Sequence, residues 1–249
     1  MKALACLALL MFLVPLAAYQ DSGFTILSPT SLSQGEAEIS IFHRFQGPVD
    51  ADVWNSLFGL NAGANVSLGL RRNIWQNIEA KASYTRAKKR VELGASWMPT
   101  TFSSPVAVQL EAAWFSFAEL GIEDRRNNFL YLVSARNNLQ NERGTLTLNA
   151  GYDGYYQRFI SGAALHVKLN EDAALVGEYY PVWDRESASP QLKARMGKHD
   201  SWVAGFKYST WGHNFLFSLS NSWQNHPATM SLGTDSSDLF LGFNIQRRF

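Results

Sequence analysis

Apolar and polar side chains alternate one by one along most of the chain after residue 35. In Gly63–Ile74, for example, Val66, Leu68 and Leu70 lie on one side, and the residues between them are polar or small. A strand points successive side chains to opposite faces, so this pattern predicts β-strands with one apolar and one polar face. The sequence therefore predicts an all-β protein.

The alternation predicts about twelve strands of about 8 to 12 residues each, and a tilted strand that crosses a bilayer needs roughly 9 to 11. Their expected bounds are Glu36–Phe45, Gly63–Ile74, Asn77–Arg86, Lys89–Met98, Val106–Phe117, Phe129–Asn138, Gly144–Tyr152, Phe159–Leu169, Ala173–Tyr180, Asp200–Thr210, Asn214–Asn221 and Asp238–Phe249. The alternation is poor in the sixth and eighth of these strands, so their registers stay open.

The connections between these strands alternate in length. Long or moderate connections such as Gln46–Ala62 and Pro181–His199 take turns with short ones such as Trp75–Gln76, and only Ala87–Lys88 breaks the order. Outer-membrane barrels alternate long outer loops with short periplasmic turns in this way. Aromatic residues gather at the strand ends, where the interfacial girdles of such a barrel belong. We therefore expect residues 36–249 to form a single antiparallel transmembrane β-barrel in contact with outer-membrane lipid.

The first residues are typical of export. Lys2 precedes the apolar run Ala3–Leu16, and the small residues at 17 and 18 suit signal peptidase. Residues 1–18 are predicted to be a signal peptide, and residues 19–35 a periplasmic lead that either hangs free or enters the barrel mouth. An exported barrel of this kind belongs in the outer membrane of a Gram-negative bacterium. The closing strand, which ends at the aromatic Phe249, is expected to be the contact for the barrel-assembly machinery.

Composition supports the barrel and excludes other classes. The net charge is +1, charged residues make up 17% and aromatic residues 13%. This balance does not favour nucleic-acid binding. Cys6 lies in the predicted signal peptide and is the only cysteine, so the exported chain has no thiol chemistry.

The polar faces hold charges of both signs in nearly equal number. The residues predicted to line the lumen are Glu38, Arg44, Arg71, Glu79, Lys81, Glu92, Glu111, Arg136, Lys168, Glu178, Lys207 and Arg248. Either they form salt bridges that brace a closed interior, or they line a narrow hydrated pore. A strand number of about twelve lies between filled small barrels and open porins, so it does not decide between the two.

Residues for chemistry are sparse. The histidines are scattered, without the spacing of a metal site on one element, and no nucleotide or phosphate motif is present. His166 with Ser134 or Ser161 is the one arrangement that suggests a hydrolase. We therefore assign no catalytic residue, metal site or cofactor, and we expect a protein that is not an enzyme. An apolar cluster of Trp54, Leu57 and Phe58 in the first long connection is expected either to cover the barrel mouth, to contact a partner or to gate a pore.

Two stretches carry a family resemblance: SPTSLSQGEAEISIFHRF at Ser28–Phe45 and FGLNAGANVSLGLRRNI at Phe58–Ile74. They resemble the amino-terminal half of an uncharacterised bacterial outer-membrane β-barrel family, domain of unknown function 5777. Asn61 stands where the family pattern has Asp, and an Ala is inserted before Gly63. The resemblance implies a barrel and transfers no catalytic residue.

Three functions follow from the sequence, in order of preference. The first is a narrow passive channel or transporter for a small polar solute. The second is a structural or partner-docking barrel with a plugged lumen. The third is an outer-membrane hydrolase.

Overall fold

The computed structural model describes residues 23–50, 53–99, 106–118, 125–139 and 143–249. The predicted signal peptide and the first residues of the lead lie outside these ranges. Within them the chain forms twelve strands. These are β1 (Ala37–Phe45), β2 (Ala64–Trp75), β3 (Ile78–Thr85), β4 (Arg90–Trp97), β5 (Val106–Ala118), β6 (Arg125–Asn138), β7 (Gly144–Asp153), β8 (Arg158–Lys168), β9 (Ala173–Tyr180), β10 (Ser201–Thr210), β11 (His213–Ser220) and β12 (Phe240–Arg248).

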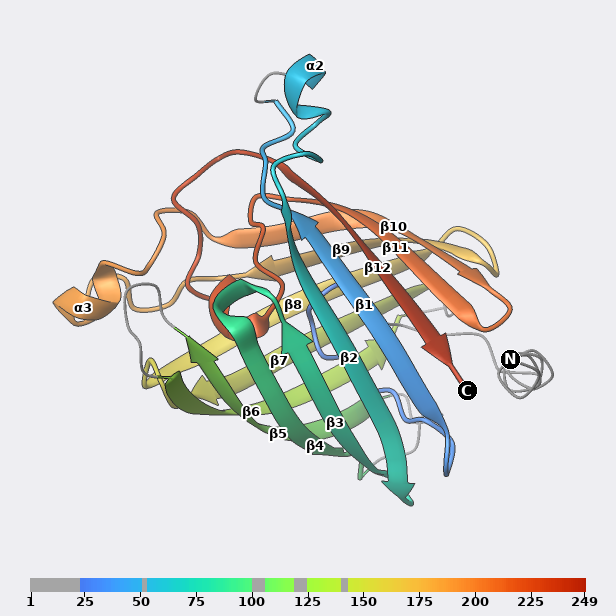
Figure 1. The fold of residues 1–249 in the computed structure, drawn as a ribbon. Helices are drawn as coiled ribbons and strands as arrows, with labels where there is room; N and C mark the ends of the chain where they lie inside the picture. Colours follow the sequence, from blue (N-terminus) through green and yellow to red (C-terminus); the bar gives the residue numbers. More distant parts are fainter. Residues whose placement is uncertain (1–22, 51–52, 100–105, 119–124, 140–142) are drawn as a thin grey trace, which may run out of the picture.

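The strands close into one antiparallel barrel in which each strand pairs with its neighbours in sequence (Figure 1). Strands β12 and β1 complete the ring, with Ile41 opposite Ile245. The predicted fold is therefore confirmed. The strand bounds agree with the prediction to within two residues except at β6, which begins four residues earlier, at Arg125.

Alternation sorts the side chains between the two faces of the barrel. On β2, Leu68 and Leu70 are about half exposed, whereas Asn65 and Ser67 are nearly fully buried. The same division holds on β1, where Ile39 is exposed and Glu38 is buried. Apolar side chains thus cover the outside and polar ones face the interior, which is the arrangement that a lipid environment requires.

Short turns and long connections lie at opposite ends of the barrel. The tight turn between β10 and β11 contains Gly212, whose φ of 77° favours glycine. The other end carries the 3-10 helix η1 (Ala87–Lys89) and the one-turn helices α2 (Val53–Ser56), α3 (Pro190–Lys193) and α4 (Pro227–Met230). No helix in the described ranges is long and apolar enough to cross a membrane.

Helix α2 stands away from the barrel at this end (Figure 1). Trp54 is 89% exposed, and Leu57 and Phe58 are about half exposed. The expectation that this cluster covers the barrel mouth is therefore wrong. Gly59 packs closely against the backbone of Gly47 at the base of this loop, where a side chain would not fit.

Two segments enter the barrel interior, called the lumen below. One is the lead segment, residues 23–35, which runs inside the strands toward the end where the C-terminus lies. The other is the cap loop, residues 221–239 between β11 and β12, whose helix α4 lies inside the opposite end. Phe24 and Ile26 of the lead segment and Met230 of the cap loop are almost fully buried.

The two inserted segments explain why the alternation is weak in some strands. On β6 the inward Leu130 and Leu132 form an apolar cluster with Ile160 of β8, and Leu27 of the lead segment packs against it. These inner positions are apolar because they contact a protein segment rather than water. The weak alternation is therefore a signature of the filled side of the lumen.

Candidate functional site

The candidate site is the polar wall, defined as the inner faces of β1–β5. At the end near the termini, Arg71 of β2 binds two carboxylates, Glu38 at 2.7 Å and Glu79 at 3.4 Å. Arg248 of β12 also contacts Glu38, at 3.4 Å. Glu38 and Arg71 lie directly opposite each other in the register of β1 and β2. The cluster joins two acids and two bases, so its charges balance.

Lys81 of β3 binds Glu111 of β5, although β4 lies between them. The β4 residue opposite Lys81 is Gly94, which in turn faces Ala113 of β5. Gly94 has no side chain to block the path, so the lysine extends across β4 to the carboxylate. This ion pair lies in the middle of the polar wall.

A third charged group occupies the outer end of the wall. Arg90 Nε lies 3.9 Å from Glu92 Oε2, and His226 Nε2 of the cap loop lies 3.1 Å from the same oxygen. His226 Nδ1 accepts a hydrogen bond from the backbone N–H of Ala228 at the start of α4. Nδ1 must therefore be unprotonated, and Nε2 must carry the proton that is donated to Glu92.

Burial, with the nearby charge of Arg90, lowers the pKa of His226, and Glu92 opposes the shift. The neutral ring is therefore the form that fits this position. It satisfies both nitrogens and caps α4, so His226 holds the cap loop against the wall.

Asparagines and hydroxyls add a second attachment for the cap loop. Asn225 accepts from Asn65 Nδ2 at 3.1 Å and donates to Ser67 Oγ at 3.0 Å. Ser67 is also hydrogen-bonded to Thr85. On the far side of the lumen, Arg158 Nη1 donates to the Ser231 carbonyl at 3.0 Å. The cap loop is thus bonded to two sides of the barrel.

The lead segment is anchored on Glu178 of β9. The Glu178 carboxylate accepts from the backbone N–H groups of Phe24 at 2.5 Å, Thr25 at 3.0 Å and Ile26 at 3.1 Å. The Thr25 hydroxyl donates to the same carboxylate at 2.6 Å. Four donors from three consecutive residues converge on one buried side chain, which makes Glu178 the main polar anchor of this segment.

Further along, the lead segment is bonded at two more points. Asn149 of β7 pairs with both the N–H and the carbonyl of Leu27, at 2.9 and 2.7 Å. At Leu32 the N–H donates to Glu79 at 2.7 Å, and the carbonyl accepts from Asn73 at 2.8 Å. The side chains thus replace the partners that a strand would supply, so that the buried backbone is satisfied.

One side of the lumen is apolar where these segments dock. Phe24 and Ile26 pack with Val176, Leu216 and Met230 in a single buried cluster. The opposite side, the polar wall, is hydrophilic. The lumen is therefore divided into a filled apolar half and a polar half.

The remaining residues predicted to line the lumen are spread around the barrel. Arg44 is fully buried beneath the ring of Phe24, 5.6 Å from its centroid, and donates to Asn244 at 2.9 Å. Arg136 of β6 and Lys207 of β10 are buried, and Lys168 at the end of β8 is half-buried. The polar wall brings together Glu38, Arg71, Glu79, Lys81, Glu92 and Glu111, and Arg44 lies on its β1 edge, while Arg136, Lys168, Glu178, Lys207 and Arg248 lie on other strands.

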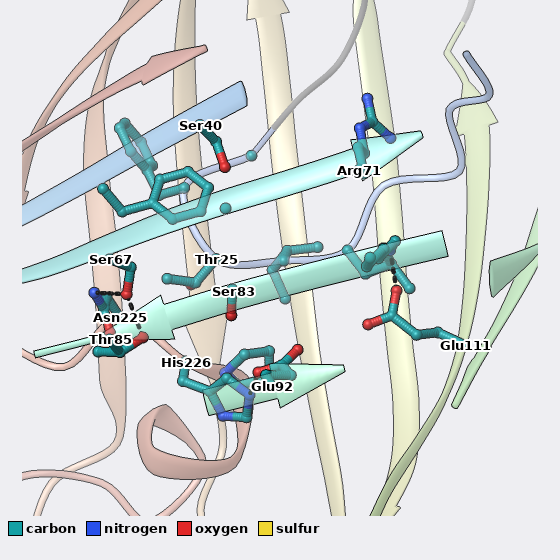
Figure 2. A pocket seen from close by; sticks show the side chains of 18 of the residues that line it. Thr25, Ser40, Ser67, Arg71, Ser83, Thr85, Glu92, Glu111, Asn225 and His226 are labelled. Atoms are coloured by element: carbon teal, nitrogen blue, oxygen red, sulfur yellow. Dashed lines mark hydrogen bonds and ion pairs between the residues drawn. The ribbon is translucent and has the colours of Figure 1, made fainter. Parts of the chain in front are cut away.

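A cavity of about 220 Å³ remains between the lead segment, the cap loop and the polar wall. Figure 2 shows that Ser40, Arg71, Ser83, Glu92 and Glu111 border this space from the strands. The lead segment borders it through Phe24 to Ser28, and the cap loop through Asn225 to Pro227. The space is therefore enclosed by three separate parts of the chain.

The lead segment enters the barrel interior, which is one of the two alternatives stated from the sequence, but its individual contacts and the docking of the cap loop were not predicted. Phe24 and Ile26 alternate with Thr25, which is a short strand-like signal beside the predicted signal peptide. In the cap loop, Met230 and Leu232 are apolar residues in a polar connection. Both signals were present, but neither segment is long enough for its pattern to stand out.

The hydrolase arrangement is not assembled. Ser161 and His166 are five positions apart on β8, so they point to opposite faces, and Ser161 bonds Trp183 instead. Ser134 donates to the Leu27 carbonyl at 2.6 Å and accepts from Asn149. Among the described residues, no group of three or more His, Cys, Asp or Glu side chains is placed to hold a metal ion.

Comparison with protein families finds a match for the carboxyl-terminal part of this barrel. Residues 146–249 match the family described as Membrane bound beta barrel domain (DUF5777). The resemblance noted from the sequence is thereby confirmed. The stretches that carried it, Ser28–Phe45 and Phe58–Ile74, lie outside the matched residues. No curated protein matches the chain.

Solved structures show a similar barrel. KdgM porin has 11% identity and a TM-score of 0.54, with 85% of this chain and 99% of that chain covered. "KdgM porin in complex with disordered oligogalacturonate" gives a TM-score of 0.55 at the same identity and coverage. A mutant of Rh. blastica porin is 15% identical over 74% of this chain and 55% of that chain, with a TM-score of 0.37. At these identities the KdgM likeness shows the fold.

Proposed function

We propose that this DUF5777-type barrel is an outer-membrane channel of narrow bore, which passes small polar solutes and catalyses no reaction. The observation that carries the proposal is the cavity of about 220 Å³ beside the polar wall. The lead segment and the cap loop fill the apolar half of the lumen and leave this space between themselves and the polar wall. Polar solutes need such a lining to exchange water for protein contacts.

The fold supports the same conclusion. A closed barrel with an apolar exterior suits outer-membrane lipid, and the amphipathic closing strand β12 is the proposed contact for the barrel-assembly machinery. The likeness to KdgM porin supports passage of a polar solute as a class. An acidic ligand such as the oligogalacturonate in one KdgM structure does not suit this lumen, because the polar wall carries equal numbers of acids and bases.

A second candidate function has an observation of its own. Glu178 accepts four hydrogen bonds from the lead segment, and Phe24 lies in the apolar cluster with Met230 of the cap loop. This attachment favours a plugged barrel that supports or docks a partner. The two candidates differ in whether the docked lead segment leaves a continuous path.

Planar-bilayer recording tests the proposal. Folded full-length protein is compared with a variant that lacks residues 23–32. A matched control deletes residues 186–194 in the connection that carries α3, which lies outside the lumen. We expect small stepwise currents from the full chain and the control, and larger steps from the variant without the lead. Silence of the full chain with conduction by the shortened one would establish the plugged barrel instead.

A further inference from the structure

We propose that the cavity beside the polar wall is a binding site for one neutral, hydroxyl-rich unit, such as a single sugar ring or a small polyol. The proposal deepens the channel function above and rests on it for its biological role. Its physical basis is the chemistry of the lining, which has one apolar side, one polar side, balanced charge and free hydroxyls.

The two sides of the cavity differ in polarity. Phe24, Ile26 and Leu27 of the lead segment border it together with Leu130 and Leu132 of β6. The polar wall borders it on the opposite side. A sugar ring has hydrocarbon faces and hydroxyl edges, so it presents apolar and polar surfaces to match. Binding sites for small ligands generally combine apolar walls with a few polar groups in this way.

The charged groups of the cavity cancel. Within the described lining, the acids are Glu38, Glu92 and Glu111, and the bases are Arg71, Lys81 and Arg90. Each acid has a base as its neighbour: Glu38 with Arg71, Glu111 with Lys81, and Glu92 with Arg90. An ionic solute that enters would lose its hydration without finding a free counter-charge. The balance therefore selects against ions of either sign.

Hydroxyl groups supply the unused hydrogen-bonding capacity. Ser40 and Ser83 face the cavity (Figure 2), and the side-chain hydroxyl of neither makes a hydrogen bond to another described residue. A serine hydroxyl both donates and accepts, so it matches the hydroxyls of a sugar or polyol.

The size of the cavity sets an upper limit. A volume of about 220 Å³ lies below the range of drug-sized pockets, which begins at about 300 Å³, and exceeds a cavity of about 150 Å³ that holds one benzene ring. One ring with its hydroxyls fits, and a second ring does not. The outer end is bordered by Asn225 and His226, so a longer chain cannot extend past the cap loop while this loop is docked.

Equilibrium binding to the folded, detergent-solubilised full chain tests the site, with D-glucose, D-glucuronate and D-glucosamine as probes. These three have the same ring and differ in charge. We expect glucose to bind at least about fivefold more tightly than either charged probe, because the charge adds a desolvation cost that no free counter-charge in the cavity offsets. Equal binding of all three, or tighter binding of a charged probe, would overturn the proposal.

Variants that remove one charge of either sign should shift the ligand preference in opposite directions. Glu111→Gln leaves Lys81 without its carboxylate partner, so the affinity for glucuronate should rise about tenfold relative to the affinity for glucose. Lys81→Met should shift the preference toward glucosamine, and the double variant should return it to glucose. Glu171→Gln makes the same change in an exposed turn and should leave the preference unchanged. Heat-modifiable migration on gels identifies the variants that fold.

The outcomes separate this proposal from the channel function. Stepwise currents without preferential glucose binding would leave the channel standing and refute the site. Glucose binding without currents would support the site in a barrel that does not conduct. A preference that fails to follow the charge variants would also refute the site, since its selectivity is assigned to the balance of Lys81 and Glu111.

Discussion

Removal of the Glu178 carboxylate is the sharpest perturbation of the lead segment. Glu178→Ala leaves three backbone N–H groups and the Thr25 hydroxyl without their acceptor. A hydrogen bond to a charged acceptor contributes about 1.5–3 kcal/mol, and bonds that share one acceptor are not additive. If the four hydrogen bonds together stabilise the docked lead by about 4 kcal/mol, the variant lowers the ratio of docked to released lead by a factor of about 1,000.

Limited proteolysis measures that ratio. Residues 23–35 contain no Lys or Arg but include Phe24, Leu27 and Leu32, so chymotrypsin is the suitable protease. When opening is fast, the cleavage rate follows the released population. We expect Glu178→Ala to be cut in the lead segment far faster than the native chain. Glu178→Gln, which keeps one carbonyl oxygen as acceptor, should fall between them.

The matched control is Glu171→Ala, in the exposed turn between β8 and β9. It removes a carboxylate from the neighbourhood of the same strand and touches no part of the lead segment. Cleavage of Glu178→Ala within about twofold of this control would refute the anchoring role of Glu178. An unchanged single-channel conductance after the segment has been cut would show instead that the docked lead does not narrow the path.

Three further predictions test other parts of the structure. The docked cap loop disfavours protonation of His226, so an undocked loop binds a proton more readily below the ordinary pKa of 6.5. Docking of the cap loop should therefore weaken as the pH falls below about 6.5. Hydrogen exchange of residues 226–233, corrected for intrinsic rates, would show the weaker docking as faster exchange. A His226→Asn variant should lose this pH dependence. Gly94→Val places a branched side chain between Lys81 and Glu111, so it should lower both the unfolding temperature and the affinity for glucose. Unchanged values would show that the ion pair does not need a residue without a side chain at position 94. Trp54→Ser should change the free energy of unfolding by less than about 0.5 kcal/mol, because the side chain is 89% exposed, and a larger loss in a denaturant titration would show a buried contact.

The barrel was predictable because its signal repeats in every strand. A lipid exterior and a polar interior force alternation, as in β2, where Leu68 and Leu70 face out and Asn65 and Ser67 face in. The early start of β6 was not predictable, since the added residues from Arg125 to Asn128 are all polar and resemble a loop. Strand pairing to β5 extends the strand there despite its composition.

The contents of the lumen were much less predictable. Contacts such as Phe24 with Glu178 join residues 154 positions apart, and no local pattern reports them. Trp54 shows the converse: its apolar neighbourhood suggested a buried cluster, but its side chain is exposed on a loop that stands away from the barrel. Charge pairs across a strand, such as Lys81 with Glu111, depend on an intervening Gly94 that has meaning only once the register is known.

Solute-specific swelling of proteoliposomes tests the central claim most directly. Vesicles that contain the folded full chain are placed in isotonic glucose, in the trisaccharide raffinose, or in a charged solute of similar size to glucose. The cavity of about 220 Å³ and its balanced charge predict swelling in glucose that is much faster than in raffinose or in the charged solute. No swelling in glucose, or equal swelling in all three, would contradict a narrow channel along the polar wall.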